Sequence, residues 1–307
     1  MRHAAFLAQA LATPWAMQRE VLSAYAGILA RKFGGAQASQ KSAPAPPADK
    51  MQAASGNIRR AGGGSIAVIP LMGTIMQRAS LMDMCEGATS LQQFGSDFRQ
   101  AMADETVGQI LIEIDSPGGS VYGVAEMFEE VYAARAIKPV VAIANSLAAS
   151  AAYWLGCASS ELYVTPGGEV GSIGVWQAHE DWSQALEEAG VKTTLISAGK
   201  YKVEGNPFEP LTDDATAFLQ SRVQDYYTAF TKGVARGRGV PVSSASNGMG
   251  QGRVLGADAA LAEKMVDGID TLDGVIKRMQ RSQKSTKQAK SGSLQDARNR
   301  LALASVG

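Results

Sequence analysis

Residues 145–154 read N-S-L-A-A-S-A-A-Y-W, and they follow the apolar run P-V-V-A-I-A at residues 139–144. The apolar run has the length and β-branched content of a buried strand, and the alanines after it favour a closely packed helix. Ser150 stands at this junction, where unpaired N–H groups at a helix N-terminus favour negative charge on a nearby oxygen. Ser150 is therefore a candidate nucleophile, although a helix cap or a small packing residue would show the same pattern.

Working outward from this junction, apolar runs of strand length alternate with segments of helical pattern. Such alternation predicts an α/β fold with a largely parallel sheet and flanking helices. Residues 71–85, rich in Met and Gly, are predicted to form a loop that could cover a groove. The predicted strands are residues 66–70, 107–115, 139–144, 162–165, 173–176 and 192–196, and the predicted helices are 90–103, 121–137, 181–189, 212–236, 257–264 and 271–280.

Composition divides the chain into four parts. Residues 1–33 are predicted to be a helical segment, with Thr13-Pro14 as a helix start because proline is favoured at the first helical position. Residues 34–64, rich in Gly, Ala and Pro, are a predicted flexible linker. Residues 65–280 form the predicted globular domain, and the polar residues 281–307 are predicted to be disordered or helical only with a partner.

Charge and composition exclude several classes of function. The 307 residues carry 29 basic and 29 acidic side chains, with no basic cluster in the globular part that would bind nucleic acid. His3 and His179 are the only histidines, so we expect no metal and no cofactor. Cys85 and Cys157 lie far apart in the sequence and predict no disulfide, which favours a reducing compartment. The N-terminal apolar segment is interrupted before ~18 residues and lacks the form of a signal peptide, so we expect a cytoplasmic, non-secreted protein.

Three further motifs could assist a nucleophilic serine. The turn D-S-P-G-G at residues 115–119 follows a predicted strand, and its glycine N–H groups could form an oxyanion hole. Lys200 and Lys202, in G-K-Y-K, are both candidate bases if burial lowers the pKa of the amine. Ser172, in G-S-I-G-V, could orient a neutral lysine. Each motif alone is also an ordinary turn or surface loop.

The four motifs, in this order and at these spacings, resemble the signal peptide peptidase A family of serine proteases over residues 65–280. This resemblance implies a Ser/Lys catalytic dyad and the ClpP/crotonase-like fold. By position, Ser150 matches the nucleophile, Lys202 the general base, Gly119 and Ala151 the oxyanion-hole amides, and Ser172 the residue that assists the lysine. Lys200 does not match the base.

The resemblance also implies how peptides bind. Substrates are expected to add as strands along a groove beside Pro117 and Gly118, and homo-oligomers are expected because neighbouring copies complete or enclose the sites. The sequence departs from the family in two respects. Lys264-Met265 replace the usual Gly-Leu near the end, which affects packing rather than chemistry. Ala151-Ala152 stand where Gly-Gly usually follows the nucleophile. Because alanine is small and keeps its N–H, we expect activity to survive.

Within the family, the chain resembles more closely the head maturation proteases of tailed phages. The shared features are P-W-A-M near the N-terminus, His179 after G-S-I-G-V, and V-E-G-N-P-F-E-P after Lys202. This likeness implies capsid and scaffold proteins, and the chain itself, as substrates in a procapsid of the host cytoplasm. His179, which is followed by Glu180 and Asp181, remains an alternative base in place of lysine.

Three other functions remain open from the sequence. The chain could be a non-catalytic capsid assembly or scaffold protein on the same fold, in which the terminal segments would be the functional parts. It could be a cellular protease similar to signal peptide peptidase. It could also be a crotonase-type acyl-CoA enzyme, although such an enzyme would not need both Ser150 and Lys202.

Overall fold

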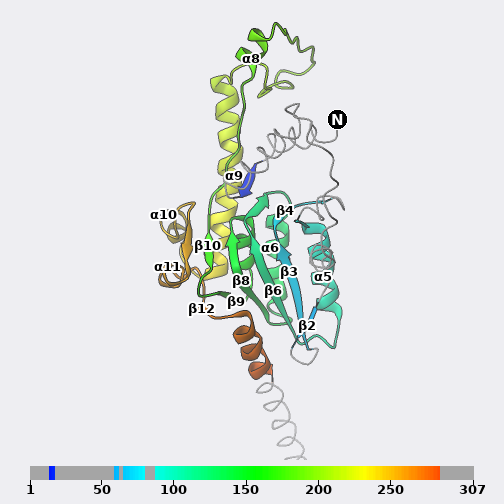
Figure 1. The fold of residues 1–307 in the computed structure, drawn as a ribbon, viewed down its shortest axis with the longest axis vertical. Coiled ribbons are helices and arrows are strands. Elements are labelled where there is room, and N and C mark those ends of the chain that lie inside the picture. Colours follow the sequence, from blue (N-terminus) through cyan, green and yellow to red (C-terminus); the bar gives the residue numbers. More distant parts are fainter. Residues whose placement is uncertain (1–13, 18–58, 62–64, 80–86, 284–307) are drawn as a thin grey trace, which may run out of the picture.

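The computed structural model describes residues 14–17, 59–61, 65–79 and 87–283. Its centre is an eight-stranded sheet whose main path runs β11-β10-β8-β6-β3-β2, with β9 beside β8 and β12 beside β9 (Figure 1). Strands β3, β6, β8, β9 and β10 run parallel to their neighbours on this path, whereas β2 and β11 pair antiparallel at the edges. The strands are β2 Arg59–Ala61, β3 Ile66–Met72, β6 Gln109–Ser116, β8 Val140–Ala149, β9 Glu161–Val164, β10 Glu169–Gly171, β11 Val254–Gly256 and β12 Gly268–Ile269.

A second, four-stranded sheet stands at the carboxyl ends of the parallel strands. Its order is β1-β7-β4-β5, with β1 antiparallel to β7. Strand β7 follows β6 after the single residue Pro117, so the chain passes from one sheet directly into the other. The strands are β1 Trp15–Met17, β4 Thr74–Met76, β5 Ala88–Ser90 and β7 Gly118–Ser120.

Helices cover both faces of the large sheet, as the alternation of side chains along its strands requires. In β3, Ala67 and Ile69 join the main hydrophobic cluster with α5, α6, α7 and α9, while Ile66 and Val68 join a smaller cluster with a final helix of residues 272–283. The other helices are α5 Leu91–Ala103, α6 Val124–Ala134, α7 Ala151–Gly156, α8 Ser183–Glu188, α9 Asp213–Arg238, α10 Val242–Asn247 and α11 Ala257–Ala262.

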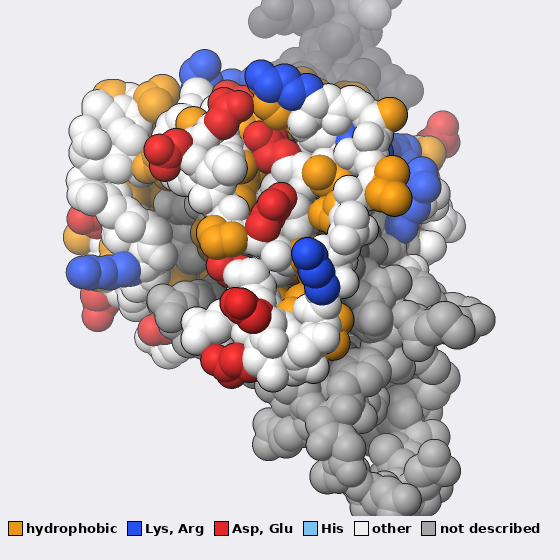
Figure 2. All heavy atoms as spheres, turned by 90° about the horizontal axis from the view of Figure 1, so that it is seen from above, with side chains coloured by type: hydrophobic (Ala, Val, Ile, Leu, Met, Phe, Trp, Pro, Cys, Tyr) orange, Lys and Arg blue, Asp and Glu red, His pale blue; other side chains and the backbone are white. Residues whose placement is uncertain are grey.

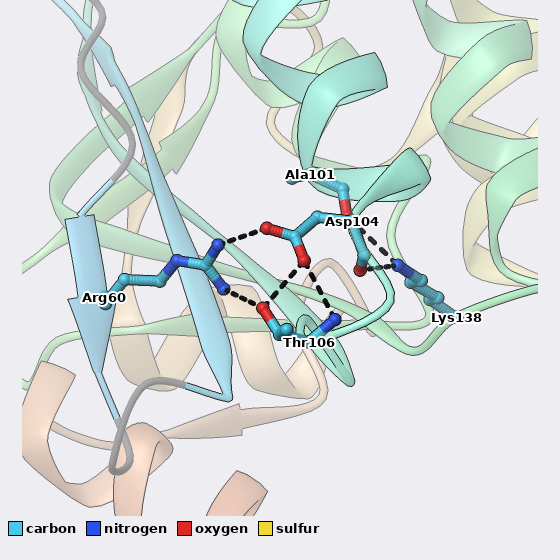
Figure 3. A network of polar contacts seen from close by, with 5 residues as sticks. All are labelled: Arg60, Ala101, Asp104, Thr106 and Lys138. Atoms are coloured by element: carbon cyan, nitrogen blue, oxygen red, sulfur yellow. Dashed lines mark hydrogen bonds and ion pairs between the residues drawn. The ribbon is translucent and has the colours of Figure 1, made fainter.

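A polar network joins β2 to the loop after α5 (Figure 3). The Arg60 guanidinium pairs with the Asp104 carboxylate, which also accepts hydrogen bonds from the N–H and hydroxyl of Thr106 at 2.8 Å and 2.7 Å. These bonds, with Thr106 first, lower the pKa of Asp104 to about 2. Lys138 Nζ donates to the carbonyls of Ala101 and Asp104 at 3.1 Å and 2.8 Å. The network therefore fixes the helix end and the sheet edge together.

Residues 177–219, here called the arm, extend away from the sheets. The arm contains α8 and the start of α9, and it lies at the far end of the molecule from the final helix (Figure 1). Helix α9 begins with a cap in which Thr212 Oγ1 accepts from the Ala215 N–H at 3.1 Å, and it ends at Gly239 in the left-handed conformation. From Arg222 onward α9 contacts the body, through Tyr122 and then α7, whereas its first turns belong to the arm. Helix α9 therefore carries the arm outward.

The predicted α/β class is confirmed, and most predicted elements are present. The strands predicted at 66–70, 107–115, 139–144 and 162–165 are β3, β6, β8 and β9, and the six predicted helices all occur with small shifts of their ends. Cys85, most of residues 1–33 and 34–64, and residues 284–307 lie outside the described residues. The predicted helical segment, linker and tail therefore remain largely predictions.

Several local predictions were wrong. The helix start at Thr13-Pro14 is contradicted because Trp15–Met17 form strand β1, and the predicted linker contributes β2. Residues 192–196 form no strand because no other strand of the described chain runs beside them, and Ile196 is 95% exposed. The strand predicted at residues 173–176 does not form, and Trp176 makes only an isolated bridge to Trp15. The strand in this part of the chain is β10, which ends at Gly171. The predicted 71–85 loop contains β4.

Candidate active site

Ser150 lies between the end of β8 and the start of α7, in a backbone conformation that favours glycine, with φ 56° and ψ −120°. Non-glycine residues adopt such a conformation at a cost of about 1–3 kcal/mol, and they do so where the surrounding structure demands it. The side chain does not cap the helix, and its buried Oγ has no hydrogen-bond partner among the described residues. The structure therefore excludes the simple capping role and displays a serine on a strained strand-to-helix turn, as hydrolase nucleophiles are displayed.

The turn is held in place from both sides. The Ser150 N–H donates to the Gly171 carbonyl at the end of β10, at 2.7 Å. On the helix side, Tyr153 Oη donates to the Met265 carbonyl at 2.9 Å, and the next ring, Trp154, stacks on Phe230 of α9 with centroids 4.7 Å apart. All six residues of α7 are buried. The backbone around Ser150 is therefore fixed by β10, by the segment at Met265 and by helix α9.

The glycine turn predicted from D-S-P-G-G lies directly beside the serine. Ser116 Oγ accepts from the Gly118 N–H at 3.1 Å and donates to the Gly73 carbonyl at 2.6 Å. Gly118 has φ 95°, and a Cβ there would lie 2.9 Å from Ser150 Cβ. A Cβ on Gly119 would lie 1.9 Å from the Ile75 carbonyl oxygen of β4. Both glycines are thus required by close backbone approach, and Pro117 leads into them half-buried.

Two other predicted residues also reach this place. Ala151 supplies the first N–H of α7, and the first N–H groups of a helix have no intrahelical acceptor. Ser172 is buried and directly follows Gly171, whose carbonyl holds Ser150. The structure therefore brings the candidate nucleophile, the two candidate oxyanion amides and the candidate assisting serine close to one another.

The candidate bases do not join them within one chain. Lys202 is exposed on the arm, in the segment between α8 and α9. Lys200 is exposed as well, and its Nζ donates to Tyr201 Oη at 2.7 Å. His179 Nε2 donates to the Asn206 backbone carbonyl, which can only accept, at 2.9 Å, and this bond joins two segments of the arm.

The length of α9 shows how far the start of this helix, in the arm, lies from the part of the helix that packs beside Ser150 and α7. Phe230 contacts α7, whereas Asp213 begins the helix 17 residues earlier. At 1.5 Å per residue, the start of α9 is about 25 Å further along the helix axis. Lys202 precedes α9 in the exposed segment of the arm, and the described contacts do not bring it to the Ser150 of its own chain.

Other chemistry near the site can be assessed directly. Burial raises the pKa of the Cys157 thiol to about 12, so this cysteine at the end of α7 is no thiolate nucleophile. Among the described residues, we find no group of His, Cys, Asp or Glu side chains arranged to hold a metal ion. Over the same residues, no helix has the length and apolarity needed to cross a membrane.

A strained serine beside a buried glycine turn, at the carboxyl ends of parallel strands, is the arrangement seen in serine-type hydrolases on α/β folds. Comparison of the sequence with protein families agrees. Residues 133–286 match the model of peptidase family S49, and the chain belongs to this family. The resemblance found from the motifs is therefore confirmed.

Individual relatives include two phage proteins. The chain is 36% identical over 212 residues to the capsid assembly protease C of Escherichia phage lambda, covering 67% of this chain and 48% of that protein. It is 35% identical over 210 residues to the head-tail preconnector protein GP5 of Enterobacteria phage P21, covering 67% and 42%. A chloroplastic serine protease SPPA of Arabidopsis thaliana is 27% identical over 216 residues, covering 70% and 32%. The chain thus spans less than half the length of each of these proteins.

Sequence reasoning missed two features of the site. The left-handed conformation of Ser150 has no signature in A-A-S-A-A, because no glycine marks it. The segment Trp15–Met17 also reaches the site, where it pairs with β7. In the sequence, P-W-A-M carries the resemblance to the phage proteases but no signal of a strand.

Proposed function

We propose that the protein is a serine endopeptidase that uses Ser150 as nucleophile and Lys202 as general base. The observation that carries this proposal is the buried, unpartnered Ser150 hydroxyl on its strained turn beside Gly119. We further propose that it cleaves capsid and scaffold proteins during phage head maturation, in a procapsid within the host cytoplasm. The likeness to a phage protein named a capsid assembly protease supports this choice of substrates.

In the proposed reaction, Ser150 Oγ attacks a peptide carbonyl carbon while Lys202 Nζ accepts its proton. The N–H groups of Gly119 and Ala151 stabilise the oxyanion, which is the largest single contribution in such sites. The C–N bond then breaks, and the leaving amine takes the proton from the lysine. Water hydrolyses the acyl ester by the reverse use of the same groups. Ser172, beside the nucleophile, orients the neutral lysine amine.

The lysine is supplied by a second copy of the chain. Within one chain the arm carries Lys202 away from Ser150, and the arm has a surface suited to association. Figure 2 looks onto the end where α8 lies and shows hydrophobic side chains exposed among acidic and basic ones. Burying them against another copy would stabilise the assembly by about 25 cal/mol per Å² of apolar area. Seven of the ten large exposed hydrophobic side chains of the described residues lie on the arm, at Trp182, Val191, Leu195, Ile196, Tyr201, Phe208 and Phe218.

Mixed assemblies test both the dyad and its division between copies. Ser150→Ala and Lys202→Ala should each abolish cleavage of a co-expressed capsid protein, followed by mass spectrometry of the products. Co-assembly of the two variants should restore activity, since a Lys202→Ala copy keeps its serine and a Ser150→Ala neighbour keeps its lysine. For random mixing across one repeated interface, about a quarter of the sites would be complete. An inactive mixture would refute the shared site.

Lys200→Ala is the matched control, because this lysine is two residues away and equally exposed. It should cleave like the unaltered chain. Processing retained by Lys202→Ala would instead identify His179 as the base.

A serine-directed phosphonate separates the enzyme from the main alternative. A single adduct on Ser150 supports the peptidase. If the assembled chain forms no adduct, it is a non-catalytic capsid assembly protein, for which the exposed apolar arm would still provide an interface.

A further inference from the structure

The N-terminal segment occupies the space where a substrate strand would lie. Strand β1 pairs antiparallel with β7, and Ala16 is opposite Gly119. On its other side, Trp15 exchanges two backbone hydrogen bonds with Trp176, at 2.8 Å and 3.0 Å. Trp15 is 4% exposed and Ala16 is fully buried. The segment is therefore held as an added strand between two edges, which is the way that extended peptides are bound.

The register places the Ala16 carbonyl at the candidate oxyanion hole. The Val121 N–H donates to the Pro14 carbonyl at 3.4 Å. In an antiparallel pair, hydrogen-bonded positions recur at every second residue. The next hydrogen-bonded pair is therefore Ala16 with Gly119. Trp15, which lies between Pro14 and Ala16, accordingly forms its backbone hydrogen bonds with Trp176 on the other side of the segment. The Ala16 carbonyl thus faces the backbone of Gly119, as the carbonyl of a bond to be cleaved would.

The nucleophile is close to the same carbonyl. The Ala16 oxygen lies 2.3 Å from the point where a Gly118 Cβ would stand, and Ser150 Cβ lies 2.9 Å from that point. The two atoms are therefore no more than about 5 Å apart. The Ala16 side chain belongs to the main hydrophobic cluster, so this position admits a small residue.

We infer that residues 14–17 are a substrate mimic in cis, which blocks the peptide groove of its own chain with the Ala16–Met17 bond at Ser150. This inference rests on the proposed peptidase function, because it assigns the groove to peptide substrates. Peptides from other proteins must then compete with a tethered strand. A tether supplies an effective concentration on the order of 1 mM. If the strand itself has an intrinsic Kd of about 0.1 mM, any competing peptide should bind roughly tenfold more weakly to the blocked chain.

Binding of a short peptide tests the block without requiring catalysis. The probe is a labelled peptide of residues 13–18, T-P-W-A-M-Q, titrated by fluorescence anisotropy into Ser150→Ala chains. The chain lacking residues 2–17 should bind it at least about tenfold more tightly than the full chain. A chain lacking only residues 2–10 keeps β1 and should behave like the full chain. Equal affinity for the full and the truncated chain, or no binding to the truncated chain, overturns the inference.

A second variant covers the case in which truncation prevents folding. The full chain with Trp15→Ala and Ala16→Pro loses the buried ring and the N–H opposite Gly119, so it should bind the peptide as the truncated chain would. Phosphonate labelling of Ser150 in the active protein is measured separately. Loss of labelling in every form would refute the peptidase while leaving the binding result to decide whether residues 14–17 occupy the groove.

Discussion

Gly119→Ala should damage both the fold and the proposed oxyanion hole, because a methyl group there meets backbone. Its Cβ would lie 1.9 Å from the Ile75 oxygen and 2.6 Å from the Ile75 nitrogen and carbon. Since contacts under 3.0 Å do not persist, β4 and β7 must separate by about 1 Å. Overpacking of this kind lowers the free energy of unfolding by about 3 kcal/mol. Moving one oxyanion donor reduces kcat by about 10²–10³-fold.

Urea unfolding measures the first effect, and the rate of cleavage of a quenched peptide, at a temperature where the variant is folded, measures the second. Gly167→Ala is the matched control, because a Cβ at Gly167 meets nothing within 4 Å, and it should change neither quantity. A folded Gly119→Ala protein that cleaves at the normal rate would refute the assignment of this amide to the oxyanion hole.

Three further predictions concern the support of the site. Asp267→Asn should lower the free energy of unfolding by about 2–3 kcal/mol in urea, because it leaves the buried Arg238 guanidinium without the carboxylate that it contacts at 2.7 Å and 2.8 Å. Because hydrogen bonds led by Thr106 lower the pKa of Asp104 to about 2, its contribution to stability is complete above the ordinary pKa of 3.8 and is lost as the pH falls toward 2. The urea midpoint of Asp104→Asn should therefore approach that of the unaltered chain on acidification. Phe230→Ala removes the ring stacked on α7 and should cost about 3–5 kcal/mol by thermal unfolding, with slower phosphonate labelling of the nucleophile.

The strands β3, β6, β8 and β9 of the large sheet were predictable because each carries its own signal. Residues 107–115 and 139–144 are continuous apolar runs, as strands covered on both faces require, and they became β6 and β8. The helix of residues 212–236 had a cap and two acidic residues in its first turn, and α9 has the same start. Local chemistry and tertiary packing agree in these elements, so a single sequence suffices.

Elements that depend on a distant partner were not predictable. Thr13-Pro14 is a good helix start by propensity, but Trp15–Met17 pair with β7 about a hundred residues later, and both backbone edges of the segment find partners there. The run K-T-T-L-I at residues 192–196 has the composition of a strand, but no strand of the described chain lies beside it, and it has no regular secondary structure. Strand formation is a property of pairs of segments, and no pattern within one segment reports its partner.

The residues of the candidate site also fall into a predictable and an unpredictable group. Ser150, Gly119, Ala151 and Ser172 were predicted from motifs at the ends of neighbouring strands, and the fold brings them together because the carboxyl ends of parallel strands share one edge. Lys202 comes from the arm, whose position no strand determines. Its role in the dyad therefore stays a prediction that only an assembly of chains can test.

The energetics of Ser150 support the proposal that its site is completed by a second copy of the chain. An unpaired buried hydroxyl costs about 1–3 kcal/mol, and a left-handed φ at a non-glycine residue costs about as much again. Both costs fall on the same residue. Glycine at this position would relieve the backbone strain and remove the unpaired hydroxyl. The proposed partner group would explain why a serine stands there. An amine from a neighbouring arm would accept the hydroxyl proton, and the same event would convert a strained, silent site into an active one.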